Sequence, residues 1–80
     1  MDDIRILGMP VLLTTHAIRR AQERGIAYPV QVEQILQTGK ITRRGKHGVR
    51  VTKNGRHGSL VCIGEIRGGF VRITTIERGN

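Results

Sequence analysis

Three histidines are the side chains of this sequence that can exchange protons near neutral pH. His16 is the most informative of them, because it follows Thr14 and Thr15, either of which can cap the start of a helix. Amide groups in the first turn of a helix attract anions such as phosphate. A neutral imidazole beside a bound phosphate is what a general base for an RNA 2′-hydroxyl requires. The alternative is that His16 is only a hydrogen-bonded partner of the helix start.

Two arginines follow His16 on the same predicted helix and extend this hypothesis. The guanidinium groups of Arg20 and Arg24 could stabilise the charge that develops on a phosphate in the transition state. His47 or His57 could act as the general acid, although both lie in glycine-flanked loops. The histidines lack the spacing of metal ligands. The predicted catalytic set is therefore His16, Arg20 and Arg24, cleaving a phosphodiester without a metal or a cofactor and leaving a 2′,3′-cyclic phosphate.

A strong positive charge is the second feature that bears on chemistry. The 80 residues contain fourteen Lys and Arg against six Asp and Glu, which gives a formal net charge of +8. Most of these cations are arginines, whose planar guanidinium can hold two phosphate oxygens at once. The sequence therefore favours RNA as a partner over a surface that is merely solubilising. With one Tyr, one Phe and no Trp, it offers few platforms for stacking bases, so contact with the backbone is expected.

The basic residues are concentrated in two glycine-rich loops and on alternate positions of the predicted strands. Glycines at positions 45, 48, 55 and 58 would let backbone amides approach a phosphate closely. The predicted RNA-binding residues are Arg43, Arg44, Lys46, His47, Arg50, Lys53, Arg56 and Arg72.

Two helices are expected in the first half of the chain. Apolar residues at helical spacing predict one helix near residues 15–24, ended by Gly25 in a left-handed conformation, with Ile26 folding back onto the helix. A second helix should start at Pro29, whose fixed φ suits the first position, and should end at Gly39.

Strands are expected after residue 40, where the apolar period becomes alternating. Asn54-Gly55 predicts a hairpin turn, residues 59–67 a central strand, Gly68-Gly69 a second turn and residues 70–77 a last strand, with 41–43 as an added outer strand. The predicted fold class is α+β, with two N-terminal helices packed on a three- to four-stranded antiparallel sheet. We expect a single domain over residues 1–80, in which 1–13 form an extra strand or a tail.

The alternation also predicts the two faces of the sheet. The face covered by the helices should carry Val61, Ile63, Val71 and Ile73. The opposite, open face should carry Arg50, Thr52, Leu60, Cys62, Ile66, Arg72 and Thr74. A single bulge would reverse part of this assignment.

The chain resembles a bacterial family of small uncharacterised domains that is similar to the RelE-like toxins. The resemblance rests on the run from Thr15 to Ile26 (THAIRRAQERGI), the Pro-initiated helix that follows it and the run ILQTGK. These toxins belong to the wider barnase–EndoU–colicin–RelE nuclease grouping. The resemblance covers about residues 14–76 and implies an α+β fold and, for some members, ribonuclease activity. His16 and Arg24 match the recurring polar residues of its helical motif. The chain departs from the well-studied toxins because its last strand ends in Glu77-Arg78-Gly79-Asn80, without a basic residue and a tyrosine.

These observations define the expected partners and location. They predict an RNA-binding, toxin-like protein that is a metal-independent ribonuclease, or alternatively a basic module of the same fold that binds RNA or a protein without catalysis. RNA, an acidic antitoxin protein and a second copy of the chain are the candidate partners. No apolar segment is long enough for a membrane span, and Asp2 and Asp3 do not suit a signal peptide, so we expect a cytoplasmic protein. The lone Cys62 lies in an apolar run and is expected to be buried and inert.

Overall fold

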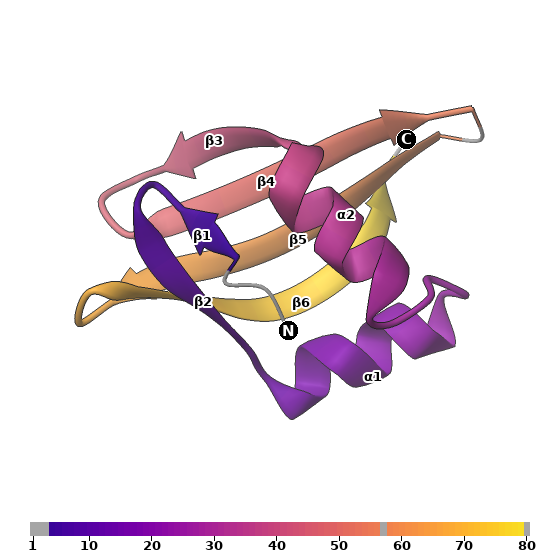
Figure 1. Ribbon diagram of the computed structural model, residues 1–80, viewed down its shortest axis with the longest axis horizontal. Helices are drawn as coiled ribbons and strands as arrows, with labels where there is room; N and C mark the ends of the chain where they lie inside the picture. The colour runs from indigo at the N-terminus through magenta and orange to yellow at the C-terminus, as the bar shows by residue number, and fades with distance from the viewer. Residues whose placement is uncertain (1–3, 57, 80) are drawn as a thin grey trace.

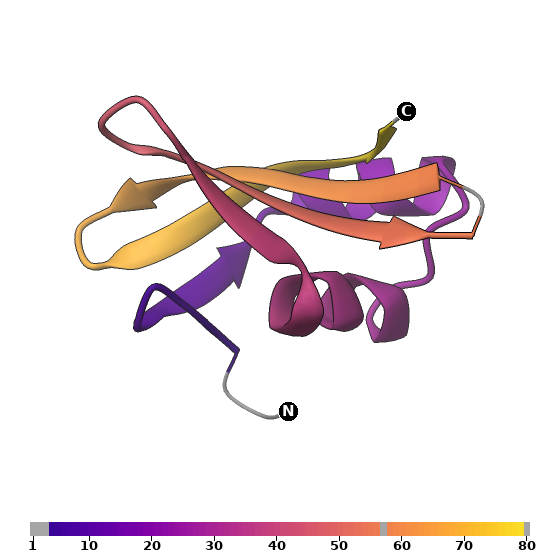
Figure 2. The same cartoon turned by 90° about the horizontal axis from the view of Figure 1, so that it is seen from above.

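The computed structural model describes residues 4–56 and 58–79. Its elements are β1 (Arg5–Ile6), β2 (Met9–Leu13), α1 (Thr15–Glu23), α2 (Val30–Thr38), β3 (Lys40–Arg44), β4 (Gly48–Gly55), β5 (Gly58–Arg67) and β6 (Phe70–Gly79). The strands form one six-stranded sheet in the order β1-β2-β6-β5-β4-β3. The sheet is curved, with α2 across one of its faces and α1 alongside β6 (Figures 1 and 2).

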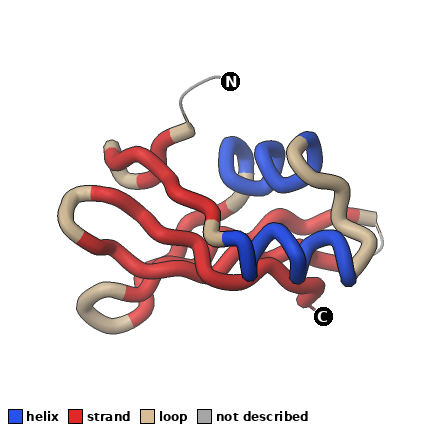
Figure 3. Tube along the Cα trace, turned by 90° about the horizontal axis from the view of Figure 1, so that it is seen from below, coloured by secondary structure: helices blue, strands red, loops and turns tan. Residues whose placement is uncertain are grey.

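The predicted fold class is wrong, because the protein is mostly sheet and the sheet is mixed (Figure 3). Within the segment 1–13 that was expected to form an extra strand or a tail, the described residues Arg5–Leu13 form the hairpin β1–β2, which adds two strands. β2 then pairs in parallel with β6, with Val11 beside Val71 and Leu13 beside Ile73. Local apolar patterns do not reveal this pairing, because parallel neighbours are joined by a long crossover, here through both helices and three strands.

The ends of α1 follow from its sequence. Thr14 caps the helix, and its side-chain oxygen accepts a hydrogen bond of 3.0 Å from the amide of Ala17. Gly25 adopts a φ of +70°, which ends the helix in the left-handed conformation that was predicted. Ile26 folds back into the core, and its amide donates to the carbonyl oxygen of Ala21 at 2.8 Å. The second helix begins one residue after Pro29, close to the predicted position.

The core lies between the two helices and the sheet face that they cover. Residues that pair across strands share a face, so Val51, Cys62 and Ile76 form one buried row across β4, β5 and β6. The buried cluster comprises Ile6, Ala17, Ala21, Ile26, Val32, Ile35, Leu36, Val49, Val51, Cys62, Val71, Ile73 and Ile76. Aliphatic side chains therefore supply nearly all of the packing, as the scarcity of aromatic residues requires.

The face assignment was correct for β4 and for the start of β6 but wrong for β5. Cys62 lies in the core, and Val61 and Ile63 lie on the open face, which is the sheet face turned away from α2. Alternation could not decide the orientation of β5, because both of its faces are apolar. A bulge between Ile63 and Gly64 also shifts the register with β6, so that Ile73 and Ile76 both reach the core and Thr74 is the extra residue.

One predicted turn is displaced and the other is confirmed. Asn54 and Gly55 lie within β4, where they pair with Ser59 and Gly58, so the chain reverses two residues later than expected. Tertiary pairing with β5 overrides the local turn preference here. The predicted general acid His57 lies outside the described residues. The second turn is at Gly68-Gly69, as predicted, and both glycines have positive φ.

Cys62 is fully buried, as predicted, and burial raises the pKa of its thiol from 9.0 to about 12. The thiol should therefore not react with Ellman's reagent in the folded protein at pH 8, but should react once guanidinium unfolds it. Reaction of the folded protein at the unfolded rate would contradict this burial.

The same shift predicts a pH dependence of stability. Because the folded-state pKa lies above the unfolded value, the contribution of the neutral thiol is complete below pH 9 and is lost as the pH rises towards 12. In that window the free energy of unfolding should fall, relative to Cys62→Ala, by up to about 1.4 kcal/mol per pH unit. Parallel curves for the two proteins in urea titrations would contradict the shift.

Candidate nucleic-acid interface

The predicted catalytic residues share α1, where His16 is exposed to solvent and Arg20 is partly exposed. The Nε of Arg20 lies 3.4 Å from the Nε2 of His16 and donates a long hydrogen bond to it. The guanidinium of Arg20 also pairs with Glu23 at 3.3 Å. Arg24 closes the helix, and its carbonyl oxygen accepts a hydrogen bond of 3.0 Å from Arg78. The structure thus brings an imidazole from the first turn and a guanidinium from the last turn together on the exposed side of one helix.

The predicted general acid His47 lies elsewhere. It is in the turn between β3 and β4, and it lines a shallow hollow with Glu65, Ile66 and Arg67 near the β5–β6 turn. Its carbonyl oxygen accepts a hydrogen bond of 2.7 Å from the amide of Ile66. Since α1 contacts β6 on a different part of the sheet, the structure does not pair His47 with His16 across one site.

Two predicted RNA-binding residues meet on the open face. Arg44 from β3 and Arg50 from β4 line a hollow of about 340 Å³ together with Ile63 and Glu77. Arg44 was expected in a loop, but it lies within β3, and the sheet register holds it near Arg50. The arrangement offers two guanidiniums beside one carboxylate over an apolar floor.

Arg50 has an unusual environment within this hollow. Its Nε is buried and has no hydrogen-bond partner among the described residues. A buried polar group without a partner costs free energy, about 1–3 kcal/mol, and native proteins rarely keep one without a reason. The Nε is a donor, so the group that would satisfy it must be an acceptor, and an anionic oxygen is the strongest acceptor for a guanidinium.

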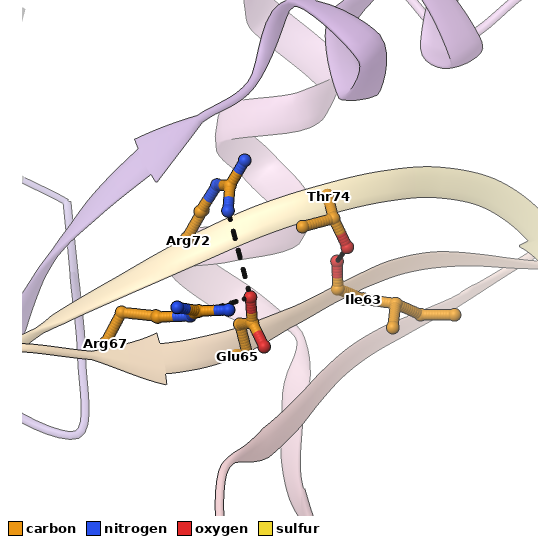
Figure 4. A network of polar contacts seen from close by, with 5 residues as sticks. All are labelled: Ile63, Glu65, Arg67, Arg72 and Thr74. Atoms are coloured by element: carbon orange, nitrogen blue, oxygen red, sulfur yellow. Dashed lines mark hydrogen bonds and ion pairs between the residues drawn. The ribbon is translucent and has the colours of Figure 1, made fainter.

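Arg72 lies on the open face, as predicted, but it is not isolated there. Figure 4 shows its guanidinium facing Glu65, with Nη1 3.9 Å from the carboxylate. Arg67 approaches the same carboxylate at 3.1 Å. Thr74, the bulge residue, donates a hydrogen bond of 3.3 Å to the carbonyl oxygen of Ile63 beside this network (Figure 4). Two cations around one anion leave this exposed patch with a net positive charge.

The remaining predicted RNA-binding residues fall into two groups. Arg43 and Lys46 are exposed near the β3–β4 turn, where the guanidinium of Arg43 donates to the carbonyl oxygen of Lys46 at 2.8 Å. Lys53 and Arg56 line a groove of about 220 Å³ at the opposite end of β4, together with Arg78. The predicted loop clusters are therefore split between the two ends of the sheet.

Sequence reasoning missed several residues of this second group. Arg78 was assigned only to the end of the last strand, and the groove also includes the amide side chains Gln31, Gln34 and Asn54. The two glutamines are spaced three positions apart on α2, which was a usable signal that they share one helix surface. Their proximity to the β4–β5 turn depends on how α2 packs and could not be read from the sequence.

The described residues show no sign of a membrane-spanning helix or of a metal site. In residues 4–56 and 58–79, neither helix has the length and apolar character needed to cross a membrane. Over the same ranges, no group of three or more His, Cys, Asp and Glu side chains is arranged to hold a metal ion. Comparisons of the chain with models of known families, with curated proteins and with solved structures find no match.

Proposed function

We propose that the protein binds RNA through its sugar–phosphate backbone, on the open face of the sheet. The observation that carries this proposal is the buried donor Nε of Arg50, which has no partner among the described residues and lines a hollow with a second guanidinium, that of Arg44. A phosphate seated between them would accept charge-assisted hydrogen bonds from both. The net charge of +8 supports the same partner, because it attracts a polyanion before any specific contact forms.

The carboxylate in the hollow favours RNA over DNA. Glu77 lies beside Arg44 and Arg50, and an ionised carboxylate can only accept hydrogen bonds. A ribose 2′-hydroxyl, which DNA lacks, donates one. With a phosphate bound by the two guanidiniums and the neighbouring 2′-hydroxyl donating to Glu77, every charged group in the hollow would have a partner.

The test is the affinity of the wild type for a short single-stranded RNA, measured by fluorescence anisotropy across a range of salt concentrations. Contact with a few phosphates predicts a steep linear fall of log K with log salt, with a slope of about −0.7 for each phosphate neutralised. DNA of the same sequence should bind more weakly at every salt concentration. Affinity that does not change with salt would contradict backbone binding.

Cleavage of RNA by α1 is a second candidate function, favoured by the contact between His16 and Arg20. The Nε2 atom that accepts the hydrogen bond from Arg20 is the one acceptor nitrogen of a neutral imidazole. Arg20 must therefore turn from His16 to the phosphate, where it stabilises the charged phosphorane, before the imidazole can take a proton from a 2′-hydroxyl. The resemblance of the Thr15–Ile26 run to domains similar to the RelE-like toxins supports this reading. Under it, the protein acts in the cytoplasm and its protein partner is an acidic antitoxin.

His16→Ala should abolish such cleavage while leaving folding and RNA affinity nearly unchanged, because His16 is exposed. The measurement is incubation of the purified proteins with total cellular RNA and a chelator, followed by gel analysis of the fragments and their 2′,3′-cyclic ends. Gln22→Ala is the matched control, since it truncates another exposed polar side chain of α1 and should leave cleavage intact. Intact RNA with the wild type, in the presence of ribosomes, would refute the nuclease proposal.

A further inference from the structure

A groove on the helix side of the molecule has a different composition from the open face. It lies between α2 and the β4–β5 turn and has a volume of about 220 Å³. Its polar side chains are Gln31, Gln34, Lys53, Asn54, Arg56 and Arg78. Three are cations, three are amides, and none is a carboxylate. Such a lining suits a ligand that combines negative charge with hydrogen-bonding edges.

Two of the three cations of the groove are held in position by the fold. The Nε of Arg78 donates to the carbonyl oxygen of Arg24 at 3.0 Å, and its Nη2 lies 3.5 Å from the carbonyl oxygen of Gly25. These contacts fix one edge of the guanidinium at the end of α1. The Nζ of Lys53 donates to Thr38 at 2.8 Å, and Thr38 in turn donates to the carbonyl oxygen of Gln34 at 2.6 Å. Two cations from different strands are thus positioned before any ligand binds, which reduces the entropy cost of binding.

The orientation of one amide is also fixed. The Oε1 of Gln31 accepts a hydrogen bond of 2.7 Å from the backbone amide of Ala27. The acceptor atom of this side chain is therefore engaged, and its NH₂ group is the part that can donate to a ligand. Gln34 and Asn54 are exposed and keep both a donor and an acceptor, which is the pattern that hydrogen-bonds the edge of a nucleobase.

We propose that this groove binds one nucleotide, with its phosphate on Lys53, Arg56 and Arg78 and its base edge against the amides of Gln34 and Asn54. Its volume of about 220 Å³ is below the roughly 300–1,000 Å³ of drug-sized pockets, so the groove can cover the phosphate and one base edge of a single nucleotide but cannot enclose a larger ligand. The nucleotide is either free or part of an RNA strand, since both present the same chemistry. The site uses none of the residues that line the open-face hollow and does not depend on the function proposed for that hollow.

The first test uses the full chain labelled with ¹⁵N and titrated separately with AMP, GMP, CMP, UMP, inorganic phosphate and a short RNA. We expect nucleotides and RNA to shift the side-chain amide signals of Gln31, Gln34 and Asn54, and inorganic phosphate to shift those of Gln34 and Asn54 much less. Equal shifts with phosphate and with every nucleotide would overturn the base contact. No shift in the groove with any of these ligands would overturn the site.

Gln31→Glu gives a matched second test. The carboxylate can still accept the hydrogen bond from Ala27, so the start of α2 is preserved, but it replaces a donor with a negative charge beside the phosphate. Nucleotide affinity should fall at least tenfold. Gln37→Glu makes the same change at an exposed position of α2 outside the groove, and it should change affinity less than twofold. Equal effects of the two variants would overturn the proposal.

The two RNA-related proposals can fail separately. If the short RNA binds with the salt dependence expected for the open face but leaves the groove signals unchanged, the groove proposal is overturned and the open-face site stands. If nucleotides shift the groove signals while changes to Arg44 and Arg50 leave RNA affinity unaltered, the groove is supported and the open-face site is the one that fails.

Discussion

The Arg44→Ala/Arg50→Ala double variant should bind a short single-stranded RNA about a hundredfold more weakly than the wild type. The two guanidiniums line one hollow of the open face. A hydrogen bond to a charged group contributes about 1.5–3 kcal/mol, and loss of one such bond from each arginine corresponds to about a hundredfold in affinity. The salt slope should also become shallower, because fewer phosphates are neutralised.

The control for this variant removes the same amount of charge elsewhere. Arg5→Ala/Arg19→Ala also lowers the net charge by two, but Arg5 is exposed on β1 and Arg19 is exposed on α1, and neither lines the hollow. This protein should lose only the affinity due to general attraction, which is a few-fold at physiological salt. If both double variants lose the same affinity, the charge acts without a defined site, and the role of the hollow is refuted.

The stability of a single variant distinguishes a functional Arg50 from a structural one. Arg50→Met keeps most of the aliphatic stem and removes the buried Nε that has no partner among the described residues. Its free energy of unfolding should equal that of the wild type or exceed it by about 1 kcal/mol, because no desolvated donor remains. A more stable protein with weaker RNA binding is the result expected where function is maintained at the expense of stability. A loss of stability would assign Arg50 a structural role.

Gly64→Ala should destabilise the protein strongly, although it adds only one methyl group. A Cβ at Gly64 would overlap the carbonyl oxygen of Arg72 on β6 and lie 3.0 Å from the Cα of Ile73. Both are backbone atoms of a central strand pair, so they cannot move without breaking the ladder at the bulge. Overpacking of this kind typically costs about 1–3 kcal/mol and occasionally more, against a total stability of about 4–12 kcal/mol for a chain of this size.

Urea or thermal unfolding followed by circular dichroism measures this effect. Gly55→Ala is the control, because Gly55 also lies in a strand but a Cβ there would meet its nearest neighbour, the carbonyl oxygen of Gly58, at 3.4 Å. It should change the free energy of unfolding by less than about 1 kcal/mol. Similar unfolding midpoints for the two variants would show that the β5–β6 contact at Gly64 is looser than described.

The elements with strong local signals were predictable. The position of α1 follows from its cap at Thr14 and its end at Gly25, which are chemical preferences of single residues. The turn at Gly68-Gly69 and the outer strand around Ile41 were likewise found. The hairpin turn at Asn54-Gly55 was not, because pairing along the whole of β4 and β5 outweighs the preference of two residues.

In the candidate site, too, some features could be predicted from the sequence and others depended on the tertiary structure. That arginines would dominate the surface, and that Arg50 and Arg72 would lie on the open face, could be inferred from composition and alternation. That Arg44 would join Arg50, and that Arg72 would face Glu65, depends on strand register. The groove containing Arg78 and Gln31 depends on contacts between residues far apart in the chain, which no local sequence pattern indicates.

The sequence by itself determined the charge, the two helices, most strand positions and the burial of Cys62, because each of these depends on residue type and on spacing within a short segment. Only the tertiary structure decided the mixed sheet, the orientation of β5 and the two places where cations gather. The physical reason is that a parallel pairing and a bulge depend on which apolar surfaces pack together and exclude water. These surfaces come from residues far apart in the chain. The histidine that first suggested chemistry lies on α1, as expected. The buried Nε of Arg50, the donor that lacks a partner among the described residues, lies on the sheet.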